Sequence, residues 1–205
     1  ALENQTSVTT VTATDQDAGD VLTFTLAGGS DVALFDLDSS TGVLTFKVAP
    51  NFESPADTDG DNVHKLTLQA SDGLGVVVQP ITVTVTDAND APVITSSASF
   101  NAAENQIAAA TLTATDEDTG ATLTFSLSGG ADVALFELES STGILSFKAA
   151  PDFETPADVD GDNIHEVILE VGDGTVSVTQ SFTVTVTDAN GCTVTSQAIN
   201  ISGPT

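Results

Sequence analysis

The sequence predicts an all-β protein made of two tandem antiparallel β-sandwiches of the Greek-key, Ig-like type. Three observations lead to this fold class. The 205-residue chain repeats itself once, apolar and polar residues alternate within each copy, and short turns rich in Gly, Asp, Asn and Pro separate the alternating segments. No segment shows helical periodicity, and the length suits two small domains.

The repeat has a constant offset of 101 residues, as in the pairs Glu3-Asn4 and Glu104-Asn105. The same offset relates Asp15–Asp17 to Asp116–Asp118, Asp31–Phe35 to Asp132–Phe136, Ser40–Gly42 to Ser141–Gly143, Phe52-Glu53 to Phe153-Glu154, and Thr82–Asn89 to Thr183–Asn190. A unit of this size is a whole domain rather than a solenoid repeat. We therefore expect one domain over residues 1–92, a second over 93–191, and a tail or the start of a following segment over 192–205.

Period-two alternation predicts the strands. Residues 21–26 place Leu22, Phe24 and Leu26 on one face, and residues 43–46 and 81–87 alternate in the same way. Threonine occupies much of the opposite face, where its β-branch suits a solvated strand. The second copy repeats the pattern over residues 123–127 and 144–147.

The charge balance excludes several partner classes. Lys and Arg number 3 against 30 Asp and Glu, which gives a formal net charge of −27. Nucleic acids and anionic membrane surfaces both require clustered cations, so neither is expected as a partner. Hydrophobic residues nevertheless make up 40% of the chain, which predicts a packed core rather than an acidic disordered tail.

The single cysteine, Cys192, leaves no pair for an internal disulfide. No apolar run reaches membrane-spanning length and Ala1 begins no signal-peptide pattern, so we expect an excised piece of an exported protein. Bound cations would stabilise such a protein in place of disulfides, by about 2.7 kcal/mol at a hundred times the dissociation constant.

At this point the motifs resemble a known family. The Glu-Asn pair near the start, "DQD" or "DED", "FxLxSSTGxLxF", Phe-Glu after "AP", "ASDG" and "TVTVTDANDAP" occur in the order typical of the cadherin repeat. The resemblance extends from Glu3 to about Asn190 and implies a cadherin-like fold. The "PADTDGDNVH" insert and the short linker "DANDAP" resemble the cadherin-like domains of bacterial secreted and surface proteins.

The resemblance implies that Ca²⁺ binds where two repeats join. Carried over by position, the ligands at the joint are Glu3, Glu53, Asp87, Asn89, Asp90, Asp116, Asp118 and Asp173. A second, distal set in copy two is Glu104, Glu154 and Asp188, which is expected to be incomplete because Gly191 replaces the counterpart of Asp90. Calcium takes six to eight oxygen ligands, which fits carboxylates gathered at turns and strand ends.

An acidic loop in each copy is a further candidate calcium site. "DTDGDN" supplies Asp57, Asp59 and Asp61, and "DVDGDN" supplies Asp158, Asp160 and Asp162. Three adjacent carboxylates repel one another unless a cation lies among them, although the same residues also suit an Asx and Gly turn. An EF-hand is excluded, because Gly60 is fourth and Leu68 twelfth in the loop. His64 and His165 follow these loops and are predicted to be strand-surface residues rather than metal ligands.

The sequence therefore predicts a non-enzymatic, calcium-binding structural and adhesion module of a large extracellular or cell-surface bacterial protein. Its expected partners are calcium, neighbouring domains of the same polypeptide, and another surface protein or a polysaccharide. Two alternatives stay open: a calcium-dependent carbohydrate-binding module, which the absence of Trp and Tyr disfavours, and an accessory domain of a secreted enzyme. No arrangement of residues suited to catalysis is evident.

Overall fold

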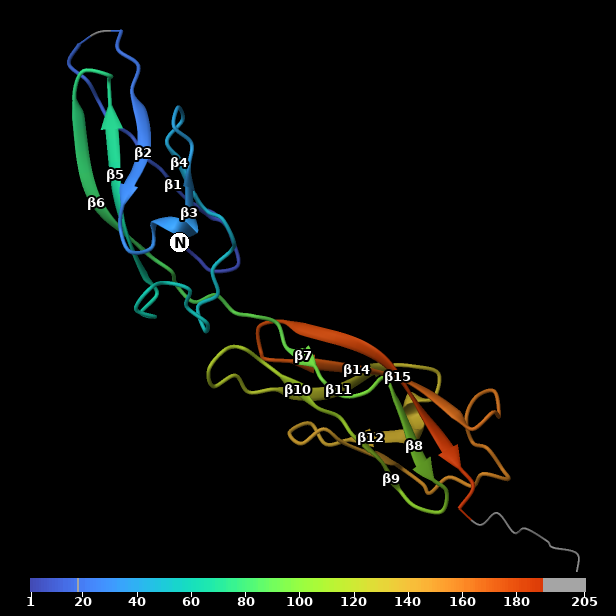
Figure 1. Ribbon diagram of the computed structural model, residues 1–205. Coiled ribbons are helices and arrows are strands. Elements are labelled where there is room, and N and C mark those ends of the chain that lie inside the picture. The colour runs from blue at the N-terminus through green and yellow to red at the C-terminus, as the bar shows by residue number, and fades with distance from the viewer. Residues whose placement is uncertain (18, 190–205) are drawn as a thin grey trace, which may run out of the picture. The chain divides into compact units, whose positions relative to one another are not determined.

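The computed structural model describes residues 1–17 and 19–189, which divide into two compact units, Ala1–Asn89 and Asp90–Thr205 (Figure 1). Asn190, Gly191 and the predicted tail over 192–205 lie outside the described residues. Among the residues described, there is no helix of the length and apolarity that a membrane crossing requires.

The first unit contains two three-stranded antiparallel sheets. One sheet has the order β1 (Ser7–Thr10), β4 (Val43–Phe46), β3 (Phe35–Leu37), and the other β2 (Thr23–Gly28), β5 (Val63–Ser71), β6 (Val76–Thr84). A single 3₁₀ turn, η1 (Val32–Leu34), leads into β3. The two sheets pack their apolar faces together, as the alternation predicts.

The second unit repeats this arrangement and adds strands at its start. Its larger sheet has the order β11 (Thr124–Gly129), β14 (Ile164–Gly172), β15 (Ser177–Thr187), β8 (Ser99–Ala103). The opposing strands are β12 (Phe136–Leu138), β13 (Ile144–Phe147) and β9 (Ala108–Thr111), with the short pair β10 (Ala114–Thr115) and β7 (Val93–Ile94), and η2 (Val133–Leu135) precedes β12.

The all-β prediction of two tandem sandwiches is confirmed, but among the residues described the pairing is parallel between β8 and β15 and at the isolated bridge of Leu2 with Thr86. β8 runs parallel to β15, with Ser99 opposite Thr183 and Ala103 opposite Thr187 (Figure 1). A strand that enters at one end of a sandwich and pairs with the last strand can run parallel to it, because the connection between them spans the whole unit.

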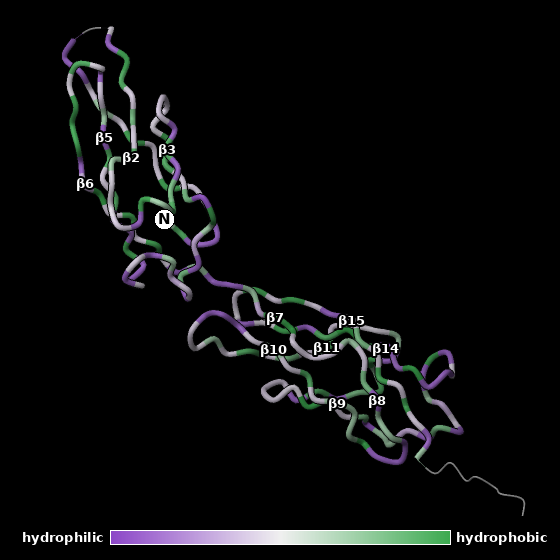
Figure 2. The backbone as a smooth tube through the Cα atoms, in the orientation of Figure 1, coloured by the Kyte–Doolittle hydropathy of each residue, from purple (hydrophilic) through white to green (hydrophobic). Residues whose placement is uncertain are grey.

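The core lies where period-two alternation places it. Leu44 and Phe46 of β4 are buried, as are Val83 of β6 and Val85 just beyond it. Figure 2 shows hydrophobic and hydrophilic residues alternating along many strands. Close packing requires a glycine directly after β2: Gly29 has φ +114°, and a Cβ there would lie 2.2 Å from the carbonyl oxygen of Lys65.

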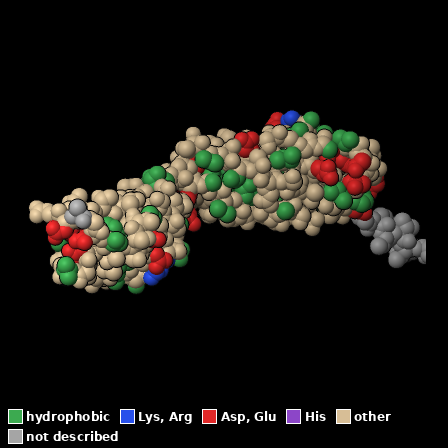
Figure 3. All heavy atoms as spheres, turned by 90° about the horizontal axis from the view of Figure 1, so that it is seen from above, with side chains coloured by type: hydrophobic (Ala, Val, Ile, Leu, Met, Phe, Trp, Pro, Cys, Tyr) green, Lys and Arg blue, Asp and Glu red, His purple; other side chains and the backbone are tan. Residues whose placement is uncertain are grey.

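Two of the three lysine side chains are hydrogen-bonded to the backbone. Lys47 and Lys148 occupy equivalent positions, and their Nζ atoms donate to the carbonyl oxygens of Ala33 and Ala134 at 2.8 Å. On the face drawn in Figure 3, Asp and Glu side chains gather in patches while Lys is seen only at isolated points.

Candidate metal centres

Glu3 is a buried carboxylate that fastens three segments of the first unit together. It is only 2% exposed. Its Oε2 accepts the N–H of Phe52 at 2.7 Å, and its Oε1 accepts the N–H of Ala88 at 2.9 Å. The start of the chain, the Phe-Glu loop and the linker after β6 are therefore joined through one charged side chain, whose burial these charge-assisted hydrogen bonds compensate.

Glu104 has the same role in the second unit. Its carboxylate accepts the N–H groups of Phe153 and Ala189, at 3.2 and 3.0 Å. The asparagine of the Glu-Asn motif is also explained, because Asn4 and Asn105 both have left-handed backbone conformations, with φ of 59° and 61°. Asn tolerates this conformation better than most residues.

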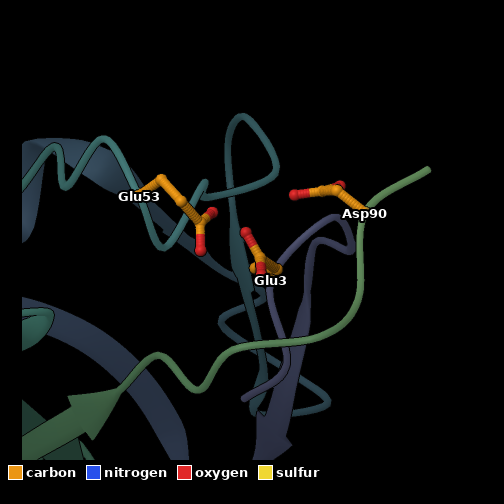
Figure 4. Close-up of side chains that lie close together, drawn as sticks. All are labelled: Glu3, Glu53 and Asp90. Atoms are coloured by element: carbon orange, nitrogen blue, oxygen red, sulfur yellow. The ribbon is translucent and has the colours of Figure 1, made fainter. Parts of the chain in front are cut away.

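Glu3, Glu53 and Asp90 offer carboxylate oxygens within 4.8 Å of one another. Figure 4 shows the three side chains directed toward a common space, with Glu53 on the loop after β4 and Asp90 in the linker. Asp87 and Asn89 are exposed in the same linker. An acidic group of this density fits a divalent cation that prefers oxygen ligands.

Asp116 and Asp118 form a second acidic group, within the second unit. The N–H of Asp118 donates to Asp116 Oδ1 at 3.0 Å, and the N–H of Asp90 donates to Asp118 Oδ2 at 2.9 Å. The remaining oxygens, Asp116 Oδ2 and Asp118 Oδ1, are buried and accept no hydrogen bond. A buried carboxylate oxygen without a donor is costly unless a cation neutralises it.

Asp173 lies in the turn between β14 and β15, and one of its carboxylate oxygens accepts hydrogen bonds within that turn. Its Oδ1 accepts the N–H groups of Thr175 and Val176 at 2.6 and 2.8 Å. Its counterpart Asp72 caps the equivalent turn, and the hydrogen bonds from the N–H groups of Gly75 and Leu74 lower the pKa of Asp72.

The distal group of the second unit brings Glu104, Glu154 and Asp188 within 4.8 Å of one another. The backbone N–H of Glu154 favours its ionised form, but burial and the charges of Glu104, Asp188 and Asp152 outweigh it and raise the pKa of Glu154. The structure therefore assembles these three predicted residues into a group of like charges.

The opposite end of the first unit gathers Asp15, Asp20 and Asp72. Asp20 is not indicated by the repeat, because its counterpart in copy two is Ala121. The N–H of Asp17 donates to Asp15 Oδ1 at 2.8 Å, so this motif forms a local turn like that of Asp116 and Asp118.

The acidic loop of the first unit is an Asx turn with a lysine side chain, that of Lys65, beside it. Asp57 is buried, and its carboxylate accepts the N–H groups of Asp61 and Asn62 at 2.9 and 3.1 Å. Burial alone would raise the pKa of Asp57, but these hydrogen bonds lower it. Asp59 forms a short ion pair with Lys65, at 2.5 Å. Asp57, Asp59 and Asp61 still offer oxygens within 4.8 Å of one another.

Asp31, which the sequence reading did not single out, anchors this loop. It is 2% exposed and accepts hydrogen bonds from the N–H of Lys65, from both the N–H and hydroxyl of Thr58, and from the hydroxyl of Ser30, all at 2.7 to 2.8 Å. Burial raises the pKa of Asp31, but the four hydrogen bonds reverse the effect and lower it well below its usual range. Asp31 thereby fixes the loop to the start of β5.

The acidic loop of the second unit has the same backbone hydrogen bonds but no lysine at the position of Lys65. Asp158 accepts the N–H groups of Asp162 and Asn163, at 2.8 and 3.3 Å. Glu166 stands where the first unit has Lys65. A hydrogen bond with Asp158 raises the pKa of Asp160, and the charge of Asp162 raises it further.

The prediction that the two histidines lie on strand surfaces is wrong. His64 and His165 are each 1% exposed. The ring of His64 packs edge-on against Phe35 and Phe46, with centroids 5.5 and 5.1 Å away, and His165 packs in the same way against Phe136 and Phe147. Both therefore belong to the apolar interior beneath the acidic loops.

The chain matches no family model. Among curated proteins it is 33% identical over 154 residues to Cadherin EGF LAG seven-pass G-type receptor 2 of human, a match that covers 73% of this chain and 5% of that protein. It is 32% identical over 193 residues to mouse Cadherin-related family member 2, covering 88% of this chain and 14% of the relative. The chain thus spans only a small part of each of these relatives.

Solved structures support the same fold. Human Protocadherin-24 EC1-2 aligns with a TM-score of 0.59 at 20% identity, covering 91% of this chain and 92% of that one. The extracellular domain of Protocadherin GammaB4 aligns with a TM-score of 0.50 at 27% identity, covering 91% of this chain and 30% of the other. The bacterial type inferred from the insert stays a prediction, since the relatives named here are human and mouse proteins. These relatives and solved structures thus support cadherin-like repeats in this chain.

Proposed function

We propose that the chain is a calcium-binding structural and adhesion module of a larger extracellular protein. In this proposal Ca²⁺ binds the ligand set where the two repeats join: Glu3, Glu53, Asp87, Asn89, Asp90, Asp116, Asp118 and Asp173. The proposed location outside the cell follows from the ion itself, since extracellular modules bind calcium at about 10⁻⁴ to 10⁻³ M. The more specific assignment to a bacterial surface protein rests on the insert and the short linker.

The single observation that carries the proposal is the pair of buried oxygens Asp116 Oδ2 and Asp118 Oδ1, which accept no hydrogen bond. Neutral donors would satisfy these atoms if the site were only a turn. Lys and Arg number 3 in the whole chain, so protein cations cannot supply the missing charge at every acidic group. A hard divalent cation fits both the oxygen donors and the charge.

The chain's own residues would hold the ion in defined ways. Glu3 already has both carboxylate oxygens fixed by backbone N–H groups, so it presents its remaining lone pairs without a further loss of side-chain freedom. Asp118 is oriented by the N–H of Asp90, which ties the linker to the "DED" turn. When bound, calcium would neutralise the gathered carboxylates and stiffen the linker.

The acidic loops are proposed as secondary calcium sites of unequal strength. In the loop of Asp57, Asp59 and Asp61, Asp59 already pairs with Lys65, whereas the loop of Asp158, Asp160 and Asp162 has Glu166 at the position of that lysine. The second loop should therefore bind calcium more tightly than the first. The distal group of Glu104, Glu154 and Asp188 is proposed to bind weakly on its own, because few ligands are gathered there.

Calorimetric titration of chelator-stripped protein with calcium tests the proposal, with the melting temperature followed in parallel. We expect several ions per chain and a rise in melting temperature of ten degrees or more, since each site at a hundred times its dissociation constant adds about 2.7 kcal/mol. Asp118→Asn should remove one class of sites, whereas Asp36→Asn, on an exposed strand residue, should not. Absence of binding at millimolar calcium would overturn the proposal.

A further inference from the structure

Each acidic loop contains a chemically reactive pair of residues, an aspartate followed by a glycine. The pairs Asp59-Gly60 and Asp160-Gly161 stand in the identical stretch "DGDN", and all four residues are exposed. Both glycines have positive φ, 71° and 75°, and a Cβ at either position would meet nothing within 4 Å. Because glycine has no side chain, its backbone nitrogen is easily approached by the preceding carboxyl group. Each loop therefore exposes a carboxyl carbon beside an unobstructed backbone nitrogen.

Such a pair can rearrange with water as the only other reactant. The glycine nitrogen attacks Cγ of the aspartate, and the new C–N bond closes a five-membered succinimide ring. The hydroxyl of the carboxyl group and the proton of the N–H leave together as water. Water then opens the ring at one of its two carbonyl carbons. Breaking the new bond restores aspartate, whereas breaking the original peptide bond gives isoaspartate, in which the main chain runs through Cγ.

In the first unit a lysine holds the reactive carboxylate. Asp59 Oδ2 lies 2.5 Å from Lys65 Nζ, and both side chains are about half exposed. To reach the nitrogen of Gly60, the Asp59 carboxyl group must leave this ion pair. An exposed ion pair contributes only a modest free energy, but that free energy is added to the barrier of ring closure. Lys65 should therefore slow the rearrangement of the first loop.

The second unit lacks this lysine. Glu166 occupies the position of Lys65. The side chain of Asp160 hydrogen-bonds with another acidic side chain, that of Asp158. Because carboxylates repel one another, this contact should restrain Asp160 less than an ion pair with lysine would.

The remaining two Asp-Gly pairs of the chain lie in hairpin turns and are held by the backbone. Asp72 Oδ1 accepts the N–H groups of the residues two and three positions further along, at 2.8 and 2.6 Å. Asp173 Oδ1 accepts the equivalent N–H groups at 2.6 and 2.8 Å. Both aspartates are half-buried. Ring closure at either would break two short hydrogen bonds, so these pairs should react more slowly than the pair in the second loop.

We propose that Asp160 is a site of spontaneous covalent modification, at which the second loop forms a succinimide with Gly161 and then isoaspartate, faster than the first loop does at Asp59. Isoaspartate adds one carbon atom to the main chain. The hydrogen bonds that Asp158 accepts from the two residues after Gly161, at 2.8 and 3.3 Å, depend on the present spacing of the loop. The modification should therefore loosen the second loop, and the isoaspartate content should rise with the age of the protein.

The test incubates the whole folded chain at neutral pH in chelator and measures isoaspartate at all four pairs by electron-transfer fragmentation in a mass spectrometer. Asp160 should isomerise about threefold faster than Asp59, which is the scale of an exposed ion pair. Lys65→Met should raise the rate at Asp59 about threefold and leave Asp160 unchanged. Glu166→Lys, which supplies the missing lysine, should slow the reaction at Asp160.

Two controls separate the effect of the fold from that of the local sequence. In urea both loops present the same "DGDN" stretch, so their rates should become equal. Asp160→Glu keeps the charge but would need a six-membered ring, which closes more slowly, so it should abolish the modification of the second loop. Equal rates at Asp59 and Asp160 in the folded chain would overturn the proposal, as would an unchanged rate at Asp59 in Lys65→Met. Because calcium is absent throughout, the result is independent of the function proposed above.

Discussion

The two acidic loops have the same backbone and different surroundings. In the first unit the anchor Asp31 accepts four hydrogen bonds, and Lys65 contacts the loop carboxylate of Asp59. In the second unit the anchor Asp132 accepts the N–H groups of Val159 and Glu166. Thr58, Ser30 and Lys65 are replaced by Val159, Ala131 and Glu166. One fold can thus carry an acidic loop with a lysine beside it and an acidic loop with a glutamate in its place.

The largest expected effect comes from removing the anchors. Asp31→Ala should destabilise the first unit by about 3 kcal/mol, and Asp132→Ala the second by about 2 kcal/mol, because each buried donor left without an acceptor costs about 1 to 3 kcal/mol. Calorimetric unfolding in chelator measures both, and Asp36→Ala, on an exposed carboxylate, is the control. Equal losses in the two units would contradict the difference in hydrogen bonding.

Acid should affect the first unit more than the second. The pKa values of Asp31 and Asp57 are lowered in the folded state, so their contribution is present above an unfolded value near 3.8 and is lost as the pH falls further. In the second unit the pKa of Asp158 is lowered but that of Asp160 is raised, and the two effects oppose each other. Urea unfolding at pH 7, 4 and 2.5, followed by NMR signals of each unit, tests the order.

Exchanging the charges of Lys65 and Glu166, which lie beside the two acidic loops, should change the melting temperatures of the two units in opposite directions. In chelator and low salt, Lys65→Glu should lower the melting temperature of the first unit and Glu166→Lys should raise that of the second, because each changes the number of unbalanced charges. Both effects should shrink in 0.5 M salt. Lys65→Met separates loss of the charge from gain of a carboxylate. An effect that salt does not change would indicate packing instead.

The smallest expected effect is on the melting temperature when the equivalent residues Asp59 and Asp160 are substituted. The two substitutions should change it in opposite directions. Asp59→Asn removes the partner of Lys65 and should slightly lower the melting temperature. Asp160→Asn removes a charge that Asp158 and Asp162 oppose, and should slightly raise it at pH 7 in chelator. At pH 3 the second effect should vanish, since Asp160 is then largely protonated. Thermal scans with circular dichroism suffice, and equal signs would refute the comparison.

Much of the fold could be predicted from alternation and the repeat, because both depend on local sequence. The apolar face of residues 43–46 is buried as expected. The histidine prediction failed although the pattern contained the signal: His64 shares its strand face with Leu66 and Leu68, which are buried. The parallel pairing of β8 could not be predicted, because alternation specifies a face and not a partner.

The residues of the candidate sites could be predicted from the sequence only in part. Clustered carboxylates indicated the metal groups, but the role of Asp31 depends on donors that lie 27 and 34 residues away in the chain. Nothing in "DVALF" distinguishes a buried anchor from a surface aspartate. Asp20 was missed because copy two has alanine there, so comparison of the copies carried no information.

The small number of lysines, all of them hydrogen-bonded, affects how the chain is cleaved by proteases. Lys47, Lys65 and Lys148 are the only Lys or Arg residues of the chain, and each donates its ammonium group to a carbonyl or a carboxylate. A protease that cleaves after basic residues therefore finds three peptide bonds, one of them within β5. A trypsin-like protease should therefore cleave the folded chain slowly, because these bonds lie within or directly after strands.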